Sequence, residues 1–407
     1  MARSYEPVTP SDNARFDFIV VVLALLTAFA PLSIDMYLPA FTAIAEDYAT
    51  DTHGVELSLT AFFFGLFIGQ LLYGTATDKF GRKKPLYVGL AIYVVTSIAC
   101  AWAPNIEWLI AMRFFQAIGA CAGIVIARAV VRDLYTPQAS ARVFSFLILV
   151  MGVAPILAPL FGAYITEFMG WRALFWIVAA LGVACAFTIH LTLPETRGRR
   201  YDVRMRHSGQ TYWQVLKDRE FLRYSLTGGI AQSGLFAYIT GSPMLFIQVF
   251  DLSPTLYSWL FGANAIGIIG FSQLNGWLLK RHASRKILNV SLPILAVVAV
   301  AMGIAAVVEA PLWGVLIPLF AYISTLGLVF PNAMAGALAN HQERAGSASA
   351  VTGSLQFLIA GLVSMGVNYV SSYSDYAMAW VISGAGLIAV ACYTIMRRPE
   401  APAEAGA

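Results

Sequence analysis

The feature that most constrains this chain is a series of long apolar runs that recurs from Phe18 to Met396. Each run has about 20 residues, the length that an α-helix needs to cross the hydrocarbon core of a bilayer. A membrane-spanning β-strand needs only about ten residues, so these runs predict helices, whose backbone hydrogen bonds are satisfied internally in lipid. We place twelve helices, at 17–39, 56–77, 84–103, 106–131, 142–166, 171–193, 221–248, 255–279, 286–308, 312–339, 345–371 and 375–396.

The composition leaves no room for a soluble domain. Of the 407 residues, 59% are hydrophobic and 12% are charged, a charged fraction about half that of an ordinary soluble protein. The first apolar run is longer than the core of a signal peptide and leads into Glu46 and Asp47 without a small-residue cleavage site. We therefore expect it to remain as the first helix of an all-α integral membrane protein.

Lys and Arg are confined almost entirely to one alternating set of loops, and short loops rich in these residues lie on the cytoplasmic side of a membrane. A missed helix would scramble this pattern, so it supports twelve spans and places both termini in the cytoplasm. We expect a multi-pass protein of the inner (cytoplasmic) membrane. The cytoplasmic cations are Arg3, Arg15, Lys79 to Lys84, Arg132, Arg142, Arg197 to Arg223, Lys280 to Lys286, Arg344, Arg397 and Arg398, and the opposite loops hold only Arg172.

The helices divide into two groups of six. We predict a cytoplasmic N-terminus at 1–16, an N-terminal six-helix bundle at 17–193, a cationic linker at 194–220, a C-terminal six-helix bundle at 221–396 and a cytoplasmic tail at 397–407. Two related bundles with a binding site between them near the bilayer midplane form a common transporter architecture. The loop after the eighth helix, Asn275-Gly276 followed by Lys280-Arg281 and Arg285-Lys286, weakly repeats the basic loop after the second helix, as related halves would. The other explanation is an accidental basic loop that topology alone requires.

The loop between the second and third helices reads Gly74-Thr-Ala-Thr-Asp78-Lys79-Phe80-Gly81-Arg82-Lys83-Lys84. This spacing resembles the signature loop of the major facilitator superfamily. The resemblance implies a cytoplasmic gate in which Asp78 meets the start of helix 11 and Arg82 reaches Asp133 at the end of helix 4. An anion at a helix N-terminus is favourable by up to about 1 kcal/mol, which suits a contact that breaks in each cycle.

Two charged residues lie inside the N-terminal bundle, Asp35 near the outer end of helix 1 and Arg113 in helix 4. Asp35 is the only acid that we place inside this bundle. A charge within a span costs about 2.5 to 3.5 kcal/mol and usually faces a cavity or a partner, so we expect both to face the cavity, with Gln116 on the same face as Arg113. We expect all three side chains to contact substrate. We expect Asp35 to bind the coupled proton and Arg113 to tune it; a static Asp35–Arg113 pair, or an Asp35 that reaches the interface, are the alternatives.

A closer resemblance rests on four segments: Ser-Ile-Asp35-Met-Tyr-Leu-Pro39-Ala, Arg113-Phe-Phe-Gln116-Ala-Ile-Gly119, Val131-Arg132-Asp133 and Ala154-Pro155-Ile-Leu-Ala-Pro159-Leu-Phe-Gly162. Together they are similar to the bicyclomycin-resistance (Bcr/CflA) group of drug:proton antiporters. In that group the helix 5 segment, here Gly152, Pro155, Pro159 and Gly162, is an antiporter motif that helps seal the outer side. Ordinary enrichment of Gly and Pro in membrane helices is the alternative.

Polar and aromatic residues in the middle of other spans are candidates to line the cavity. We expect them to contact substrate, with Met151 as an adaptable apolar surface, although the polar ones are equally suited to hydrogen bonds between helices. A mostly apolar cavity favours amphipathic, drug-like cargo over sugars. These candidates are Met151, Gln232, Phe236, Tyr238, Asn264, Asn332 and Gln356.

The function that we predict is proton-coupled export of drug-like small molecules by alternating access, and the alternative is an exporter or facilitator of a specific metabolite such as an amino acid. No nucleophile elbow, metal-spaced cluster or P-loop points to an enzyme or to ATP as energy source. We expect no cofactor and no metal, a proton gradient as driving force, and a monomer that contacts its small-molecule substrate, protons and lipid but no nucleic acid. Cys100, Cys121, Cys185 and Cys392 lie within apolar runs and are expected to be packing residues.

Overall fold

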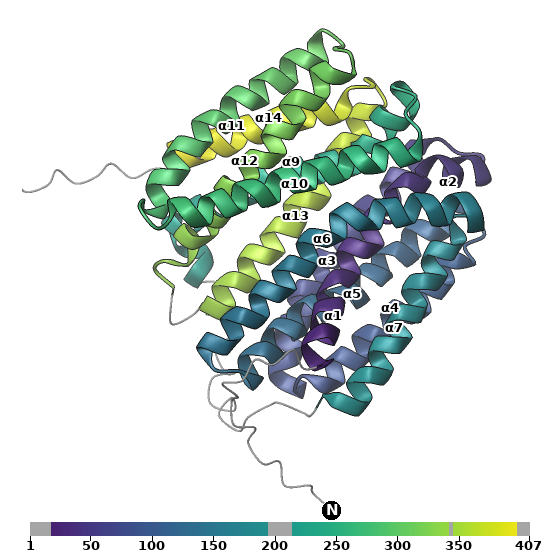
Figure 1. Ribbon diagram of the computed structural model, residues 1–407, viewed down its shortest axis with the longest axis vertical. Coiled ribbons are helices and arrows are strands. Elements are labelled where there is room, and N and C mark those ends of the chain that lie inside the picture. The colour runs from purple at the N-terminus through teal and green to yellow at the C-terminus, as the bar shows by residue number, and fades with distance from the viewer. Residues whose placement is uncertain (1–17, 194–213, 342–344, 397–407) are drawn as a thin grey trace, which may run out of the picture.

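The computed structural model describes residues 18–193, 214–341 and 345–396, and these residues fold almost entirely into helices (Figure 1). The predicted N-terminal segment 1–16, most of the linker 194–220 and the tail 397–407 lie outside the described residues. The elements are α1 (Phe18–Asp35), η1 (Leu38–Ala40), α2 (Phe41–Asp47), α3 (Thr52–Phe80), α4 (Lys83–Ala101), α5 (Ile106–Leu134), α6 (Pro137–Met169), α7 (Arg172–Thr192), α9 (Arg219–Pro243), η4 (Met244–Val249), α10 (Pro254–Leu278), α11 (Ser284–Val307), α12 (Leu312–Leu338), α13 (Ala345–Ser371) and α14 (Ala377–Ile395).

The long helices occupy the twelve predicted positions, with ends that differ by a few residues. In the described part of the chain, 11 segments are long and apolar enough to cross a membrane. Helix α10 has sufficient length, 25 residues, but is not among these segments. Its apolar character is diluted by polar residues such as Asn264, Gln273 and Asn275.

The first span differs from its prediction. Helix α1 ends at Asp35, but the chain continues through the short 3₁₀ helix η1 into α2, so that the span runs from Ile19 to Asp47. Pro39 has no N–H to bond to the carbonyl four residues earlier, which interrupts the helix without ending the span. Asp35 is the last residue of α1, as its predicted place near the end of the first helix requires, but 12 further residues of the span follow it instead of the expected four.

The two halves of the chain form two bundles. In Figure 1 the purple-to-blue helices α1 to α7 gather in one body and the green-to-yellow helices α9 to α14 in the other. The halves meet mainly where α3 packs on α13 and where α6 packs on α10. The four cysteines are free; three are buried and Cys392 is half-buried.

Candidate functional site

Asp35 lies at the break in the first span, on the side that faces the C-terminal half. Its side chain is only 3% exposed. Within the described residues, its carboxylate has neither an ion-pair partner nor a hydrogen bond. The hydroxyl groups of Tyr238 on α9 and Tyr257 on α10 lie within electrostatic range of it. The structure thus brings Asp35 close to Tyr238, one of the predicted cavity residues.

Tyr238 belongs to a polar and aromatic group on α9 and α10. The amide nitrogen of Asn264 donates a hydrogen bond to the Tyr238 hydroxyl at 3.1 Å, and the Tyr238 ring stacks on Phe261 with 5.0 Å between ring centres. The side-chain oxygens of Asn264 and Gln232 are buried and have no hydrogen-bond partner in the described part of the chain. Such oxygens are acceptors ready for a donor on a bound molecule, because an unpartnered buried polar group is costly.

Aromatic side chains surround the contact between the halves. The ring of Phe236 on α9 meets Phe63 of α3 edge to face, with centres 5.0 Å apart, and lies 6.1 Å from Phe357 on α13. Gln356 on α13 and Met151 on α6 are half-buried on helices that join the halves.

Asn332 does not belong to this group. Its amide nitrogen donates to the Asn275 side-chain oxygen at 2.6 Å and to the Leu328 carbonyl at 2.7 Å. This side chain therefore ties α12 to α10, which is the role that the sequence left open as an alternative to substrate contact.

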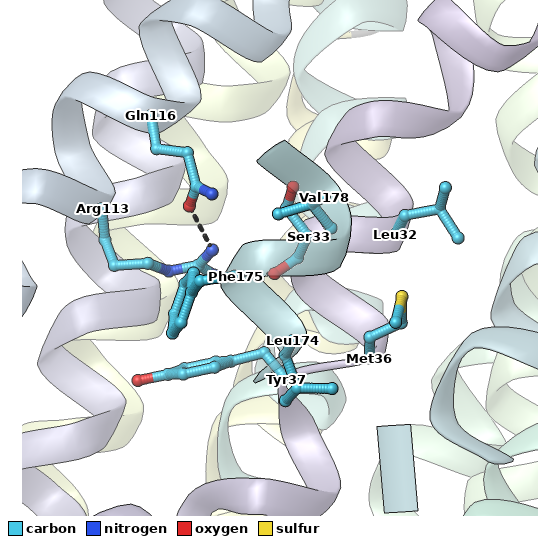
Figure 2. Close-up of a pocket in the computed structure, with 9 residues that line it drawn as sticks. All are labelled: Leu32, Ser33, Met36, Tyr37, Arg113, Gln116, Leu174, Phe175 and Val178. Atoms are coloured by element: carbon cyan, nitrogen blue, oxygen red, sulfur yellow. Dashed lines mark hydrogen bonds between the residues drawn. The ribbon is translucent and has the colours of Figure 1, made fainter. Parts of the chain in front are cut away.

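Arg113 lies on the other side of α1, in the interior of the N-terminal bundle (Figure 2). Its side chain is fully buried. The guanidinium donates hydrogen bonds to the Gln116 side-chain oxygen at 2.7 Å and to the Ser33 carbonyl at 2.9 Å. It also lies over the rings of Phe62 and Tyr37, 4.3 and 4.5 Å from their centres. Both terminal nitrogens of Arg113 are thus held by protein groups, whereas Nε is buried without a hydrogen-bond partner in the described part of the chain.

The Ser33 carbonyl is available to Arg113 because α1 is interrupted. In a continuous α-helix this oxygen would accept the N–H of Tyr37, but that N–H bonds to the Ile34 carbonyl at 3.2 Å instead. Arg113 therefore satisfies the carbonyl that the break leaves free. The fully buried guanidinium fixes the shape of the segment that carries Asp35.

Arg113 and Asp35 do not form a pair. Asp35 follows Ser33 by two residues, so its side chain points about 200° around the helix axis from the direction of the Ser33 side chain. Within the described residues no ion pair joins the two charges. The expectation that they face one cavity is wrong, and so is the alternative of a static Asp35–Arg113 pair.

Arg113 and Gln116 border a small cavity between α1, α5 and α7. The lining, drawn in Figure 2, is Leu32, Ser33, Met36, Tyr37, Arg113, Gln116, Leu174, Phe175 and Val178. All of these residues belong to the N-terminal half. Two of the predicted substrate contacts therefore lie apart from the candidates on α9 and α10.

The loop with the signature spacing joins α3 to α4. Nε of Arg82 lies 2.8 Å from Oδ2 of Asp133 on α5, and its guanidinium also donates to the Thr77 carbonyl at 3.0 Å. Gly81 adopts a positive φ of 84° after the last turn of α3, a conformation that glycine adopts readily. Gly74 and Asp78 lie in α3, but the Asp78 side chain and the residues before α13 lie outside the described part.

The predicted antiporter motif lies on α6, where this helix contacts both α1 and α10. A Cβ at Gly162 would overlap the carbonyl of Met36, at the break in the first span. The Pro159 carbonyl accepts a hydrogen bond from Ser258 of α10 at 3.1 Å. Gly152 lies opposite Ile269 of α10. Pro155 lies in α6 between Gly152 and Pro159. The motif therefore joins the Asp35 break to the other half.

One buried acid was missed by the sequence analysis. Glu56 lies inside α3 with a fully buried side chain, so the expectation that Asp35 is the only acid within the N-terminal bundle is wrong. The predicted span began at Glu56, which placed this residue at the boundary, whereas the helix begins at Thr52. The apolar run of the second span does not indicate that α13 covers the turn of α3 that holds Glu56.

Residues 23–365 match the family model of the Major Facilitator Superfamily. An uncharacterized MFS-type transporter, YdgK of Bacillus subtilis (strain 168), is 35% identical over 388 residues, which cover 94% of this chain and 96% of that protein. A bicyclomycin resistance protein homolog of Haemophilus influenzae is 27% identical over 94% of this chain and 96% of its own length.

The fold also matches a solved structure. The crystal structure of a D-xylose-proton symporter superposes with a TM-score of 0.71, over 92% of this chain and 95% of that one, at 14% sequence identity. At that identity the match shows a shared fold and nothing about cargo.

Proposed function

The chain belongs to the Major Facilitator Superfamily and is a multi-pass inner-membrane transporter of small molecules rather than an enzyme, and on this premise we propose that it exports drug-like compounds in exchange for protons. The similarity to a bicyclomycin resistance protein homolog supports a drug as cargo. We further propose that a proton gradient drives the exchange without a cofactor and that the protein acts as a monomer.

The observation that carries this proposal is the environment of Asp35. The carboxyl is 3% exposed, lies in the middle of a span, and has no counter-charge among the described residues. An unpaired carboxylate is costly in such surroundings. We propose that Asp35 holds a proton while it is enclosed and releases it when the cavity opens to water. Conformation would then set its protonation, as coupled exchange requires.

Contacts at one end of the molecule support alternating access. At the end with the loops 48–51 and 250–253, Thr52 bonds to Gln248 at 3.2 Å and Asn368 donates to the His53 carbonyl at 2.8 Å. Charge placement predicts that this end faces outward. Together with the Ser258–Pro159 bond, these contacts suit a form closed on the outside, and we propose that they break when cargo is released there.

Arg113 distinguishes the drug exporter from an amino acid carrier. A carrier for carboxylates needs a guanidinium fork that is free to hold the substrate. Here the fork bonds to Gln116 and to the Ser33 carbonyl and is fully buried. This arrangement disfavours the metabolite carrier and leaves the aromatic surface near Phe236 for apolar cargo.

The test is drug susceptibility in a pump-deficient bacterium that expresses the chain. We expect the wild type to raise resistance to several drugs and Asp35→Asn to abolish that resistance at equal membrane abundance. Asp251→Asn is the matched control, because Asp251 is exposed in a loop and asparagine tolerates its positive φ of 53°. Unchanged resistance in Asp35→Asn would remove Asp35 from the coupling mechanism.

A further inference from the structure

Glu56 is an acid enclosed at the contact between the two halves, near the outer end of α3. Its side chain is fully buried, although it lies in only the second turn of the helix. One carboxylate oxygen, Oε2, lies 3.4 Å from the Asn368 amide nitrogen of α13 and 3.7 Å from Nδ1 of His53. The other, Oε1, is buried without a hydrogen-bond partner in the described part of the chain, as is Nδ1 of His53.

The groups that face Glu56 do not neutralise an ionised carboxylate permanently. Among the described residues they are His53 in the first turn of α3, which is a titratable cation, and the more distant acid Asp51, the N-cap residue of this helix. The neighbouring element α13 contributes Asn368, which has no charge. Within the described residues neither Lys nor Arg forms an ion pair with Glu56, so a negative charge here would be unpaired and costly unless His53 carries a proton.

The His53–Glu56 pair therefore needs one proton when it is enclosed. The proton resides either on the carboxyl or on the imidazole, and the pair is neutral in both cases. The number of bound protons is therefore a property of the pair and not of one residue. His53 is 25% exposed, which gives water a route to the imidazole. In water at neutral pH a glutamate is ionised and a histidine is mostly neutral, so an exposed pair would carry one proton fewer.

The enclosure of the pair depends on the contact between the halves. Asn368 of α13 bonds to the His53 carbonyl, and deeper along the same contact Thr60 of α3 bonds to Ser364 at 2.6 Å. Separation of α3 from α13 would break these bonds and expose Glu56 to external water.

We propose that His53 and Glu56 form a proton-binding pair of the outer gate, so that closure of the outer end takes up one proton from the external medium and opening returns it. The closed form then binds one proton more than the open form, so acid favours closure. The inference rests on the proposed exporter: after a drug leaves, an external proton would favour the return step. Glu56 would thus act in addition to Asp35.

The test measures closure directly, without cargo. Spin labels are attached to Glu46→Cys and Ser372→Cys, both exposed near the outer end, in a variant whose four native cysteines are replaced. Distances between the labels are recorded in lipid nanodiscs from pH 5 to pH 9. We expect the ratio of the short to the long distance to rise on acidification, by up to about tenfold per pH unit for one proton.

Variants identify the titrating pair. Glu56→Gln, which mimics the protonated acid, should hold the short distance at every pH. His53→Gln should displace the midpoint, since Glu56 then binds the proton alone. The matched control is Asp51→Asn, which keeps the helix cap because asparagine caps as well as aspartate, and it should retain the wild-type response. Size-exclusion elution verifies that each variant is folded.

Two results would contradict the proposed proton-binding role of the pair. One is a set of wild-type distances that do not change with pH, and the other is a pH response that survives in Glu56→Gln. An unchanged midpoint in His53→Gln would remove His53 from it. The Asp35→Asn variant should keep the response, and loss of the response there would assign the proton to Asp35 instead. Because no drug is present, a pH response that is lost only in Glu56→Gln supports the pair even if efflux by Asp35→Asn disproves the proposed exporter.

Discussion

Arg113 contributes to the site through one backbone carbonyl. It bonds to the Ser33 oxygen that the interruption of α1 leaves free, two residues before Asp35. Its influence on Asp35 is therefore positional, because the guanidinium holds the shape of the segment and does not contact the carboxylate.

A lysine in place of Arg113 tests whether Arg113 acts on Asp35 by holding the backbone in place or by its charge. Arg113→Lys keeps the positive charge but loses the planar fork and the stacking on Phe62 and Tyr37. We expect a loss of stability of about 1.5 to 3 kcal/mol, the contribution of a hydrogen bond to a charged group, slower efflux, and an unchanged midpoint in the dependence of efflux on external pH. Thermal unfolding in detergent and efflux at several pH values test this. A displaced midpoint with unchanged stability would show instead that the charge of Arg113 acts on Asp35.

Residue-level features were only partly predictable from the sequence. Asp35 and Arg113 stood out because a charge inside an apolar run is rare and costly. Their separation could not be predicted, because it depends on the bond from Arg113 to the Ser33 carbonyl, which only the break in the helix leaves free. Glu56 was missed because α13, about 300 residues later in the chain, is what covers it. A single sequence does not reveal such a distant contact.

At the scale of elements, α6 is the helix that joins the Asp35 segment to the opposite half. Gly162 allows its backbone to approach the Met36 carbonyl, whereas a Cβ added at Gly152 would lie at an ordinary packing distance, 3.5 Å, from the Ile269 side chain. The same small residue thus has different roles at the two positions of the motif.

Two alanine substitutions in α6 test this difference. Gly162→Ala should lower the free energy of unfolding by about 1 to 3 kcal/mol, because an added methyl group in a packed interior forces the helices apart. Gly152→Ala is the matched control and should be close to neutral. Thermal unfolding of both variants measures the difference, and equal stability would mean that the motif reflects only the general abundance of glycine in membrane helices.

Helix positions were the most predictable elements. The predicted span at 106–131 corresponds to α5, Ile106–Leu134, and that at 345–371 to α13, Ala345–Ser371, because the requirement for about 20 apolar residues is strong. The first span was misjudged because Pro39 reads as a helix end. In the structure the chain resumes as α2 and carries the span on to Asp47.

At the scale of the whole molecule, the lone cation of the predicted outer loops has a structural partner. Nη1 of Arg172 lies 2.6 Å from the carboxylate of Asp47. An ion pair of this kind explains how a single arginine is accommodated on a side that otherwise carries acids. The orientation itself stays a prediction from charge placement.

The two bundles place acids at two levels of their contact. Asp35 lies at the interrupted first span beside α9 and α10, and Glu56 lies where α3 meets α13 toward the outer end. Movement of one bundle against the other would change the access of water to both. Proton binding in the proposed mechanism therefore takes place at the interface between the bundles, not in the interior of either bundle.

The most direct test of this account uses the purified protein in liposomes that contain a pH indicator. With no membrane potential, drug added to one side should drive protons across the membrane in the opposite direction, and an imposed pH gradient should concentrate the drug. Asp35→Asn should abolish both movements while the reconstituted amount stays equal. Drug transport by the wild type without any proton movement, or proton-driven drug accumulation by Asp35→Asn, would contradict the account.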